Sequence, residues 1–196
     1  MKTISYLAKK ITQTLPLSHS HTQMALHELL LAGVQNMVTK RGFGELSDIE
    51  SKVGHAYFIP GEILLFIPGI SNGTIDKIKN EQVNYLFFLM ETNEIRHAIV
   101  PYSALAHQAA DILRSHDVYR VELFKYKHLL FDPTAHKKTP PHFRVTDVPA
   151  ELPNIKVCDL PRILNIDPIV RFYDWNLGDV IRIERPDGVY YRVIVE

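Results

Sequence analysis

The sequence predicts an α+β protein of two domains, an α/β domain over residues 1–128 and a small α+β domain over residues 129–196. Three observations lead to this prediction. Residues 20–40 carry apolar side chains at helical spacing. Residues 131–155 contain five of the twelve prolines, which predicts an extended connector. Near the end, two alternating apolar stretches flank a Pro-Asp-Gly turn, a pattern typical of a β-hairpin.

The first predicted helix, over residues 20–40, has one apolar stripe. Ser20 or Thr22 is expected to cap its start, and Gly42 is expected to end it. The residues expected on the buried stripe are Met24, Leu26, Leu29, Leu30, Val34, Met37 and Val38.

Strands and a second helix are expected after it. Residues 57–70 predict a short apolar strand between two Pro-Gly turns. The stretches 83–90 and 95–100 are expected to pair as a hairpin, and the alternating residues 118–124 predict another strand. Ser103 is expected to cap a helix between these strands. The inward side chains of that helix would be Leu105, Ala109, Ile112 and Leu113.

The C-terminal domain is expected to hold a short helix and a terminal hairpin. Asp167 and Pro168 predict the helix start, because the carboxylate can accept from first-turn amides and proline suits the first helical position. This helix should run to about Asp174, with Gly178 after it. The stretches 179–185 and 189–195 then form the hairpin, which we therefore expect to close the domain.

Composition narrows the class of protein. Apolar residues make up 46% of the 196 residues, which is enough for a packed core. No apolar run approaches the roughly 20 residues of a membrane helix, and the N-terminus lacks the apolar core of a secretory signal. The single cysteine, Cys158, excludes an internal disulfide and a thiolate-rich zinc site. We therefore expect a soluble intracellular protein with no membrane partner.

The charge balance excludes an autonomous nucleic-acid binder. The chain has 22 Lys and Arg residues and 22 Asp and Glu residues, mixed along its length without a basic stripe. Proteins that bind nucleic acids alone gain most of their affinity when Lys and Arg neutralise phosphates. Any work near DNA should therefore depend on a larger assembly.

Local catalytic signatures are absent: the sequence has no GxSxG, Walker A, GxGxxG or HExxH motif. We predict no catalytic residue, no cofactor and no metal site. The alternative that stays open is a metal-dependent nuclease in the N-terminal domain, with Asp76 and Glu81, or Glu91 and Glu94, holding Mg²⁺. Five irregularly spaced histidines are interpreted as surface or hydrogen-bonding residues, namely His19, His21, His128, His136 and His142.

Short motifs follow one another in a fixed order through the C-terminal third. They are Pro141-His142 followed by Phe143-Arg144-Val145, Leu160-Pro161-Arg162-Ile163, Asp167-Pro168-Ile169, Phe172-Tyr173, Gly178-Asp179-Val180-Ile181-Arg182-Ile183, Arg185 and Tyr191-Arg192-Val193. Their order and spacing resemble the assembly domain of RNA polymerase subunit 5, which the eukaryotic nuclear polymerases share and whose archaeal counterpart consists of this domain alone. Two N-terminal segments resemble the family more loosely: residues 37–43, ending in Arg41-Gly42-Phe43, and residues 100–104, where Tyr102 departs from the pattern.

The resemblance implies a non-catalytic subunit of a multisubunit DNA-dependent RNA polymerase. Its C-terminal assembly domain would dock on the largest subunit, among the other polymerase subunits. Its N-terminal jaw domain, nuclease-like in shape but without nuclease activity, would help to hold downstream duplex DNA. The residues that the resemblance assigns to partner binding are Leu160, Pro161, Arg162, Ile163, Asp167, Pro168, Phe172, Tyr173, Tyr191 and Arg192.

The resemblance also bears on origin and location. Divergence concentrated in the jaw, beside a well-kept assembly domain, is expected of a homologue from a large DNA virus. A cellular protein of this family is expected in the nucleus. A viral one is expected in the host cytoplasm, at the viral factory, and in the virion.

Overall fold

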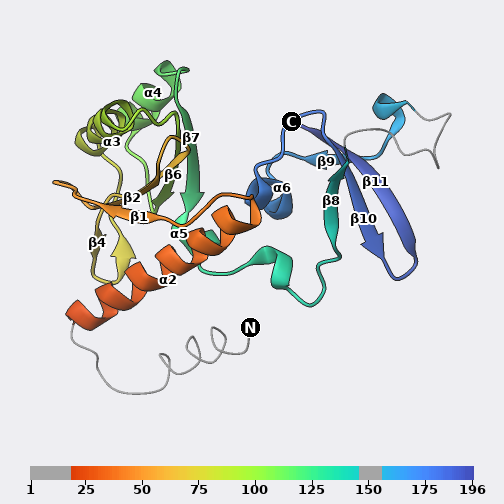
Figure 1. Cartoon of the computed structure of the whole chain (residues 1–196), viewed down its shortest axis with the longest axis horizontal. Coiled ribbons are helices and arrows are strands. Elements are labelled where there is room, and N and C mark those ends of the chain that lie inside the picture. The colour runs from red at the N-terminus through yellow and green to blue at the C-terminus, as the bar shows by residue number, and fades with distance from the viewer. Residues whose placement is uncertain (1–18, 146–155) are drawn as a thin grey trace.

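The computed structural model describes residues 19–145 and 156–196. It is an α+β structure with two main sheets, as predicted. Following the predicted boundary, we call the described residues up to 128 the N-terminal domain and those from 129 onward the C-terminal domain. The two lie side by side along the longest axis of the molecule, with helix α6 between them (Figure 1). No helix in the described segments combines the length and the apolar character needed to cross a membrane.

The N-terminal domain is built on a mixed five-stranded sheet with the order β1-β2-β3-β6-β7. The first three strands are antiparallel neighbours, whereas β3, β6 and β7 run parallel. The strand bounds are β1 Ser47–Ile49, β2 His55–Ile59, β3 Ile63–Ile67, β6 His97–Tyr102 and β7 Arg120–Lys125. A small separate hairpin, β4 Ile70–Ser71 and β5 Thr74–Ile75, follows β3.

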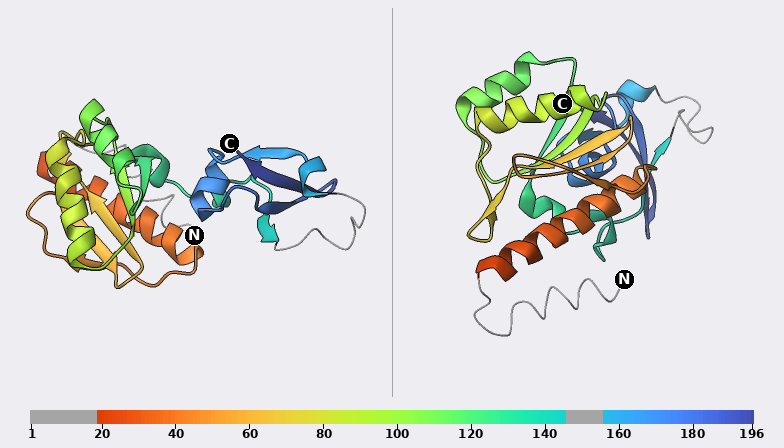
Figure 2. Two further views of the ribbon diagram at one scale, coloured as in Figure 1. Left: turned by 90° about the horizontal axis from the view of Figure 1, so that it is seen from above. Right: turned by 60° about the vertical axis from the view of Figure 1, so that its left-hand side comes forward.

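Helices cover both faces of this sheet. Helix α2 (His19–Lys40) lies on one face, and α3 (Asn80–Thr92) and α4 (His107–Ser115) lie on the other (Figure 2). The fully buried strand β3 serves both layers, because successive side chains of a strand point to opposite faces. Ile63, Leu65 and Ile67 pack in the cluster of α2, while Leu64 and Phe66 pack in the cluster of α3 and α4.

The prediction of α2 is confirmed, with helix from His19 to Lys40. Five residues of the predicted stripe are buried, whereas Met24 is 63% exposed and Leu29 is half-buried. Gly42 follows the helix with a φ of 94°, a left-handed conformation that suits a glycine after a helix end. The caps predicted at Ser20 and Thr22 concern side chains outside the described part.

The hairpin predicted from residues 83–90 and 95–100 is wrong. Residues 80–92 form α3, and only the second stretch contributes a strand, β6. The apolar run 83–90 was ambiguous because both faces of it carry apolar side chains, including Phe88, which is 57% exposed. The buried residues Val83, Leu86, Phe87 and Met90 follow the three-to-four spacing of a helix, which burial on the sheet selects.

The next predicted elements are partly confirmed. The strand predicted at 118–124 is β7. The helix predicted after Ser103 begins later, at His107, and its N-cap position is Ala106. Its inward face agrees with the prediction, since Ala109 is fully buried and Leu105, Ile112 and Leu113 pack against the same cluster.

The C-terminal domain is a four-stranded sheet with the order β8-β10-β11-β9 and a short helix against it. Its predicted hairpin is confirmed by antiparallel pairing of β10 with β11. Its predicted helix is confirmed as α6, capped by Asp167, whose carboxylate accepts from the amides of Ile169 and Val170. The bounds are β8 His142–Val145, η2 Val157–Asp159, β9 Arg162–Leu164, α6 Pro168–Tyr173, β10 Val180–Arg185 and β11 Gly188–Val195.

The segment that joins the domains is only partly extended. It contains a short helix, α5 (Tyr126–Leu129), and a turn of 3-10 helix, η1 (Pro133–Ala135), before β8 begins. The rest of the predicted connector, residues 146–155, lies outside the described residues.

Candidate functional site

Arg41 lies at the junction between the two domains, directly after α2. Its side chain is 2% exposed and pairs with both carboxylate oxygens of Glu122 on β7, at 2.6 and 3.0 Å. The same guanidinium donates to the carbonyl oxygens of Phe172 at 2.8 Å and Arg171 at 2.9 Å. Those carbonyls end α6, where helix acceptors lack partners within the helix and a positive group is favoured. Arg41 therefore joins strand β7 to the C-terminal domain.

Glu122 is the acidic centre of this junction. Its side chain is 12% exposed, and one of its oxygens lies 2.7 Å from Nε2 of His97 on β6. Burial alone would raise its pKa, but the hydrogen bonds and charges of His97 and Arg41 outweigh burial and lower the pKa to about 2. Its carboxylate is therefore ionised near neutral pH.

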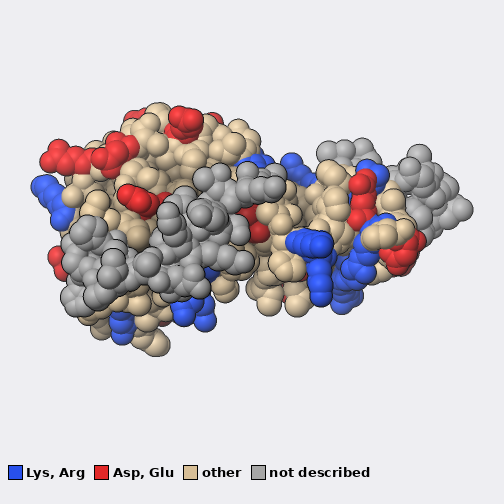
Figure 3. All heavy atoms as spheres, turned by 90° about the horizontal axis from the view of Figure 1, so that it is seen from below, with Lys and Arg blue, Asp and Glu red and all other residues tan. Residues whose placement is uncertain are grey.

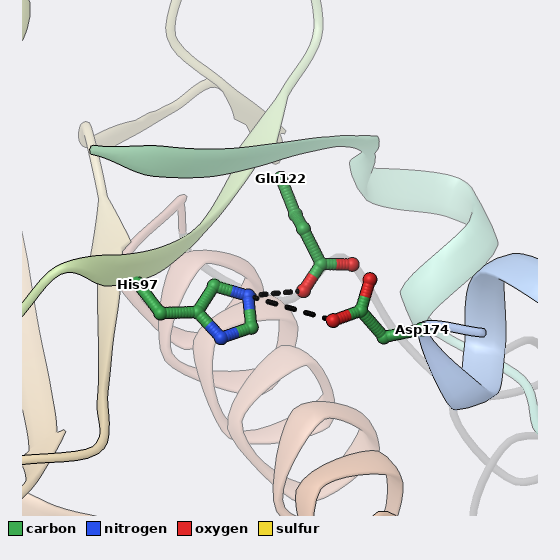
Figure 4. A group of neighbouring side chains, drawn as sticks. All are labelled: His97, Glu122 and Asp174. Carbon is green, nitrogen blue, oxygen red and sulfur yellow. Dashed lines mark hydrogen bonds and ion pairs between the residues drawn. The ribbon is translucent and has the colours of Figure 1, made fainter. Parts of the chain in front are cut away.

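Asp174 approaches the same place from the C-terminal domain (Figure 4). It caps α6 in the left-handed conformation, with a φ of 56°. Its carboxylate pairs with Arg120 of β7, and it lies 4.0 Å from Nε2 of His97. Burial, and next the negative charge of Glu122, raise its pKa despite the nearby arginines. The two carboxylates are therefore held together by the cations around them.

His97, Glu122 and Asp174 could in principle share a metal ion, because one ligand atom from each lies within 4.8 Å of the others. No other such group occurs among the residues that the structure describes. However, Arg41 already pairs with Glu122, and Arg120 already pairs with Asp174. A divalent cation would meet two fixed guanidinium charges at a site that is already neutral. We therefore interpret the group as an ion-pair network between the domains.

The carboxylates of the nuclease alternative are not brought together. Asp76 follows β5, Glu81 lies in the first turn of α3, Glu91 near its last turn and Glu94 just beyond it. Ten residues of helix separate Glu81 from Glu91, a rise of about 15 Å. None of the four belongs to the group that could share a metal ion. Nothing in the described residues favours the nuclease alternative.

The residues assigned to partner binding divide into two sets. Leu160 and Phe172 are each 6% exposed and pack inside the protein, Leu160 beneath the C-terminal sheet and Phe172 in the cluster of α2. The segment between them is far more open, with Pro161, Arg162 and Pro168 exposed. The remaining assigned residues, Ile163, Asp167, Tyr173, Tyr191 and Arg192, are half-buried.

The open segment includes strand β9, which forms one edge of the C-terminal sheet. β9 pairs in parallel with β11 on one side. Leu164 at its end is 48% exposed, and Ile166 in the next turn is 70% exposed. Leu177, 52% exposed, lies in the turn before β10, where the amide of Gly178 donates to the carbonyl oxygen of Ile194. Among the described residues this edge of β9 has no partner strand, and the exposed side chains of Leu164 and Ile166 lie at its end.

This apolar surface continues into a cavity of about 160 Å³ between the domains. Ile166 and Pro168 line it from the C-terminal domain, and Gly33 and Phe124 line it from the N-terminal domain. Phe131, 59% exposed, also lines it. Of the ten large apolar side chains that are more than 40% exposed among the described residues, seven belong to the C-terminal domain. Most of the large exposed apolar side chains among the described residues therefore lie in the C-terminal domain.

Charged side chains are unevenly spread on one side of the molecule. Seen from below, Lys and Arg side chains gather over the C-terminal domain and the segment leading to it (Figure 3). The N-terminal domain shows separated charges of both signs on that face (Figure 3).

Sequence reasoning missed the residues of the junction. Arg41 was noted only within a family-like motif, and His97, Glu122, Arg120 and Asp174 were not singled out. Arg41 and Glu122 are 81 residues apart, and Arg120 and Asp174 are 54 apart. No local spacing in the sequence predicts pairs at such separations.

Comparison with known proteins agrees with the motifs of the C-terminal third. Residues 131–194 match the family model described as RNA polymerase Rpb5, C-terminal domain. The chain is 30% identical over 124 residues to the DNA-directed RNA polymerases I, II, and III subunit rpabc1 of Dictyostelium discoideum. That alignment covers 61% of this chain and 59% of the relative's length. The C-terminal part of the chain is therefore similar to the C-terminal domain of Rpb5, and the chain spans about three fifths of the length of the relative it matches.

Proposed function

We propose that the protein is a non-catalytic subunit of a multisubunit DNA-dependent RNA polymerase. Its C-terminal domain docks on the largest subunit, and its N-terminal domain helps to hold downstream duplex DNA. The observation that carries the docking proposal is the open edge of β9 with the exposed side chains of Leu164 and Ile166 at its end. The family match covers the same part of the chain.

The β9 edge has the physical character of a protein interface. An unpaired strand edge presents free backbone groups and is normally covered or blunted. Exposed apolar side chains gathered in one place are typical of surfaces that a partner buries. Arg162 and Pro161 lie on the same segment, and Arg162 is exposed and able to pair with an acidic group. Docking here would leave Phe172 and Leu160 in supporting roles, since both are already buried.

A co-purification experiment tests the docking surface. The tagged chain is expressed with its native polymerase, and Ile166→Asp and Leu164→Asp are compared with Val118→Asp, which alters a residue of the N-terminal domain that is 61% exposed. We expect both C-terminal variants to lose most of the co-purifying large subunits and the control to keep them. Equal recovery with all three variants would contradict docking through β9.

Arg162 provides a second test of the same surface. Its side chain is exposed, while its backbone carbonyl accepts from Arg192 at 3.0 Å. Arg162→Ala should therefore leave folding unchanged and reduce assembly, if the guanidinium pairs with an acidic group of the largest subunit. Circular dichroism and co-purification separate the two effects. A loss of folding without a selective loss of assembly would count against this role.

The DNA-holding role rests on anchorage. With 22 positive and 22 negative side chains, the chain gains little affinity for DNA on its own. Anchoring raises the local concentration of DNA at the N-terminal domain, so few phosphate contacts suffice.

We expect the free chain to bind duplex DNA weakly in a gel-shift assay. A polymerase reconstituted without the N-terminal domain should lose protection of downstream DNA in footprinting; unchanged protection would contradict this role.

The subunit would act wherever that polymerase acts, in the nucleus or, for a viral enzyme, in the host cytoplasm.

A further inference from the structure

We propose that Arg41 is a positioning residue that holds the C-terminal domain at a fixed orientation to the N-terminal domain. The proposal concerns contacts within this chain and does not depend on the function proposed above. If the chain is anchored through its C-terminal domain, however, this clasp decides where the N-terminal domain lies. We define the clasp as Arg41, Glu122 and the last turn of α6.

The first argument is the geometry of Arg41. A guanidinium offers five N–H donors in a rigid fork. Here that fork meets the carboxylate of Glu122 on one side and the carbonyls of Arg171 and Phe172 on the other. The side chain is 2% exposed, so water cannot readily replace these acceptors. One buried group thus bonds both domains at once.

The second argument is that α6 reaches back to the same strand. The guanidinium of Arg171 donates to the carbonyl oxygen of Leu123 on β7 at 2.6 Å and lies 4.3 Å from the ring centre of Phe124. β7 is the edge strand of the N-terminal sheet, so α6 contacts that sheet at its edge. The side chain of Phe172 packs in the core cluster of α2. Contacts in both directions therefore fix α6 against the N-terminal domain.

The third argument concerns the rest of the connection. Domains joined by a short segment move relative to one another unless their interface is large and apolar. Besides the clasp, the segment after α5 is tied to α2 by Asp132, which accepts from Lys40 at 2.5 Å and Asn36 at 3.2 Å. Lys40 and Asp132 are partly exposed, so their ion pair is weak. Arg120 and Asp174 also pair across the junction, but Arg120 is half exposed, whereas Arg41 is 2% exposed and is therefore the best shielded of these charged groups.

Interdomain distances in the free chain test this proposal. Cys158 is exposed and is replaced by serine, and spin labels are placed at Asp117→Cys and Val189→Cys, both exposed and one in each domain. We expect a single narrow distance distribution for this background by pulsed electron spin resonance. Arg41→Met should broaden this distribution at least about twofold. The width for Arg41→Lys should lie between those of the background and of Arg41→Met, because a lysine keeps the charge but cannot form the bidentate pair.

The matched control is Arg114→Met. Arg114 is an exposed arginine whose ion pair with Asp111 lies within α4, away from the junction. Its distance distribution should equal that of the background. Hydrogen exchange of β3 and β6 should remain slow in every variant, which separates a loosened clasp from an unfolded N-terminal domain.

Arg171→Met provides a second test of the proposal. It removes the hydrogen bond from Arg171 to the carbonyl oxygen of Leu123 without leaving a buried carboxylate unpaired. It too should broaden the distribution, even if Arg41→Met fails to fold. Unchanged distributions in Arg171→Met and Arg41→Lys would overturn the proposal. These outcomes are independent of polymerase binding, so failure of the clasp and failure of the proposed function are distinguishable.

Discussion

At the scale of single residues, Glu122 and Asp174 are neighbouring carboxylates whose pKa values move in opposite directions. His97 and Arg41 lower the pKa of Glu122 to about 2 against burial. Burial and the charge of Glu122 raise the pKa of Asp174, and its arginine partners offset this only in part. The difference arises because Glu122 receives several hydrogen bonds that outweigh its burial, whereas the pKa of Asp174 is raised by burial and next by the charge of Glu122. The two acids therefore contribute differently to stability.

The first prediction compares Glu122→Gln with Asp174→Asn. Glu122→Gln leaves Arg41 buried without its anionic partner and should lower the free energy of unfolding by about 3 kcal/mol at pH 7. Asp174→Asn keeps a residue that tolerates the left-handed conformation and removes repulsion, so we expect a change below about 1 kcal/mol. Urea denaturation followed by circular dichroism measures both. Equal losses in the two variants would contradict this account.

The second prediction concerns pH. The pKa of Glu122 is lower in the folded protein, about 2, than its ordinary value of 4.5, so its stabilisation is complete above pH 4.5 and is lost as the pH falls toward 2. The raised pKa of Asp174 has the opposite effect on stability as the pH falls, because the folded state binds that proton more tightly than the unfolded state does. The stability difference between wild type and Glu122→Gln should therefore shrink as the pH falls from 5 to 3. A constant difference across this range would show that Glu122 does not carry the acid sensitivity.

The charged residues of the junction are the part of the site that the sequence predicted least well. Glu122 lies in an alternating stretch that predicted strand β7, but alternation indicates only that its side chain points to one face. His97 lies 25 residues away on the adjacent strand, and Asp174 comes from the other domain. Only the packing of the two domains brings these charges together.

At the scale of elements, α6 shows how local chemistry fixes a short helix. Asp167 accepts from the amide of Ile169 at 2.8 Å, Pro168 occupies the first turn, and Asp174 ends the helix in the left-handed conformation. Asp167 and Pro168 predicted the start of the helix, because each acts on its nearest neighbours, and the predicted end at about Asp174 is confirmed. Asp167→Ala should lower the free energy of unfolding by about 1 kcal/mol. Thermal unfolding checks this, with Asp167→Asn, which can still cap, as the control that should stay close to wild type.

Helix α2 carries the next prediction, at Gly33. A β-carbon there would lie 1.9 Å from the carbonyl oxygen of Leu129 in α5, so the two helices approach closely only because the residue is glycine. Gly33→Ala should destabilise the protein by about 1–3 kcal/mol through overpacking, although alanine is the better helix former. Chemical denaturation measures this loss. A gain in stability would show that α5 shifts away without cost.

The elements also show why some predictions failed. The stretch 83–90 was expected to be a strand, yet it is helix α3. Its side chains include exposed Phe88 among buried neighbours, so the apolar run hid the spacing of the buried set. The hairpin β10–β11 was predicted correctly, because its turn residues and alternation both point to one structure.

At the scale of the whole molecule, the fold class and the terminal hairpin followed from sequence, but the arrangement of the domains did not. Phe172 was assigned to partner binding by resemblance, and the structure buries it in the N-terminal core. The β9 edge, by contrast, is open where the resemblance expected contact. Motif order identifies a domain, whereas burial decides which of its residues remain available to a partner.

The central claim is that this chain works as part of a polymerase. The most direct measurement is affinity purification of the tagged chain from its native source through high salt, followed by quantitative mass spectrometry. The account predicts that the two large polymerase subunits are recovered in near-equal amount with the chain. Recovery of the chain alone, as a stable monomer without polymerase subunits, would contradict it.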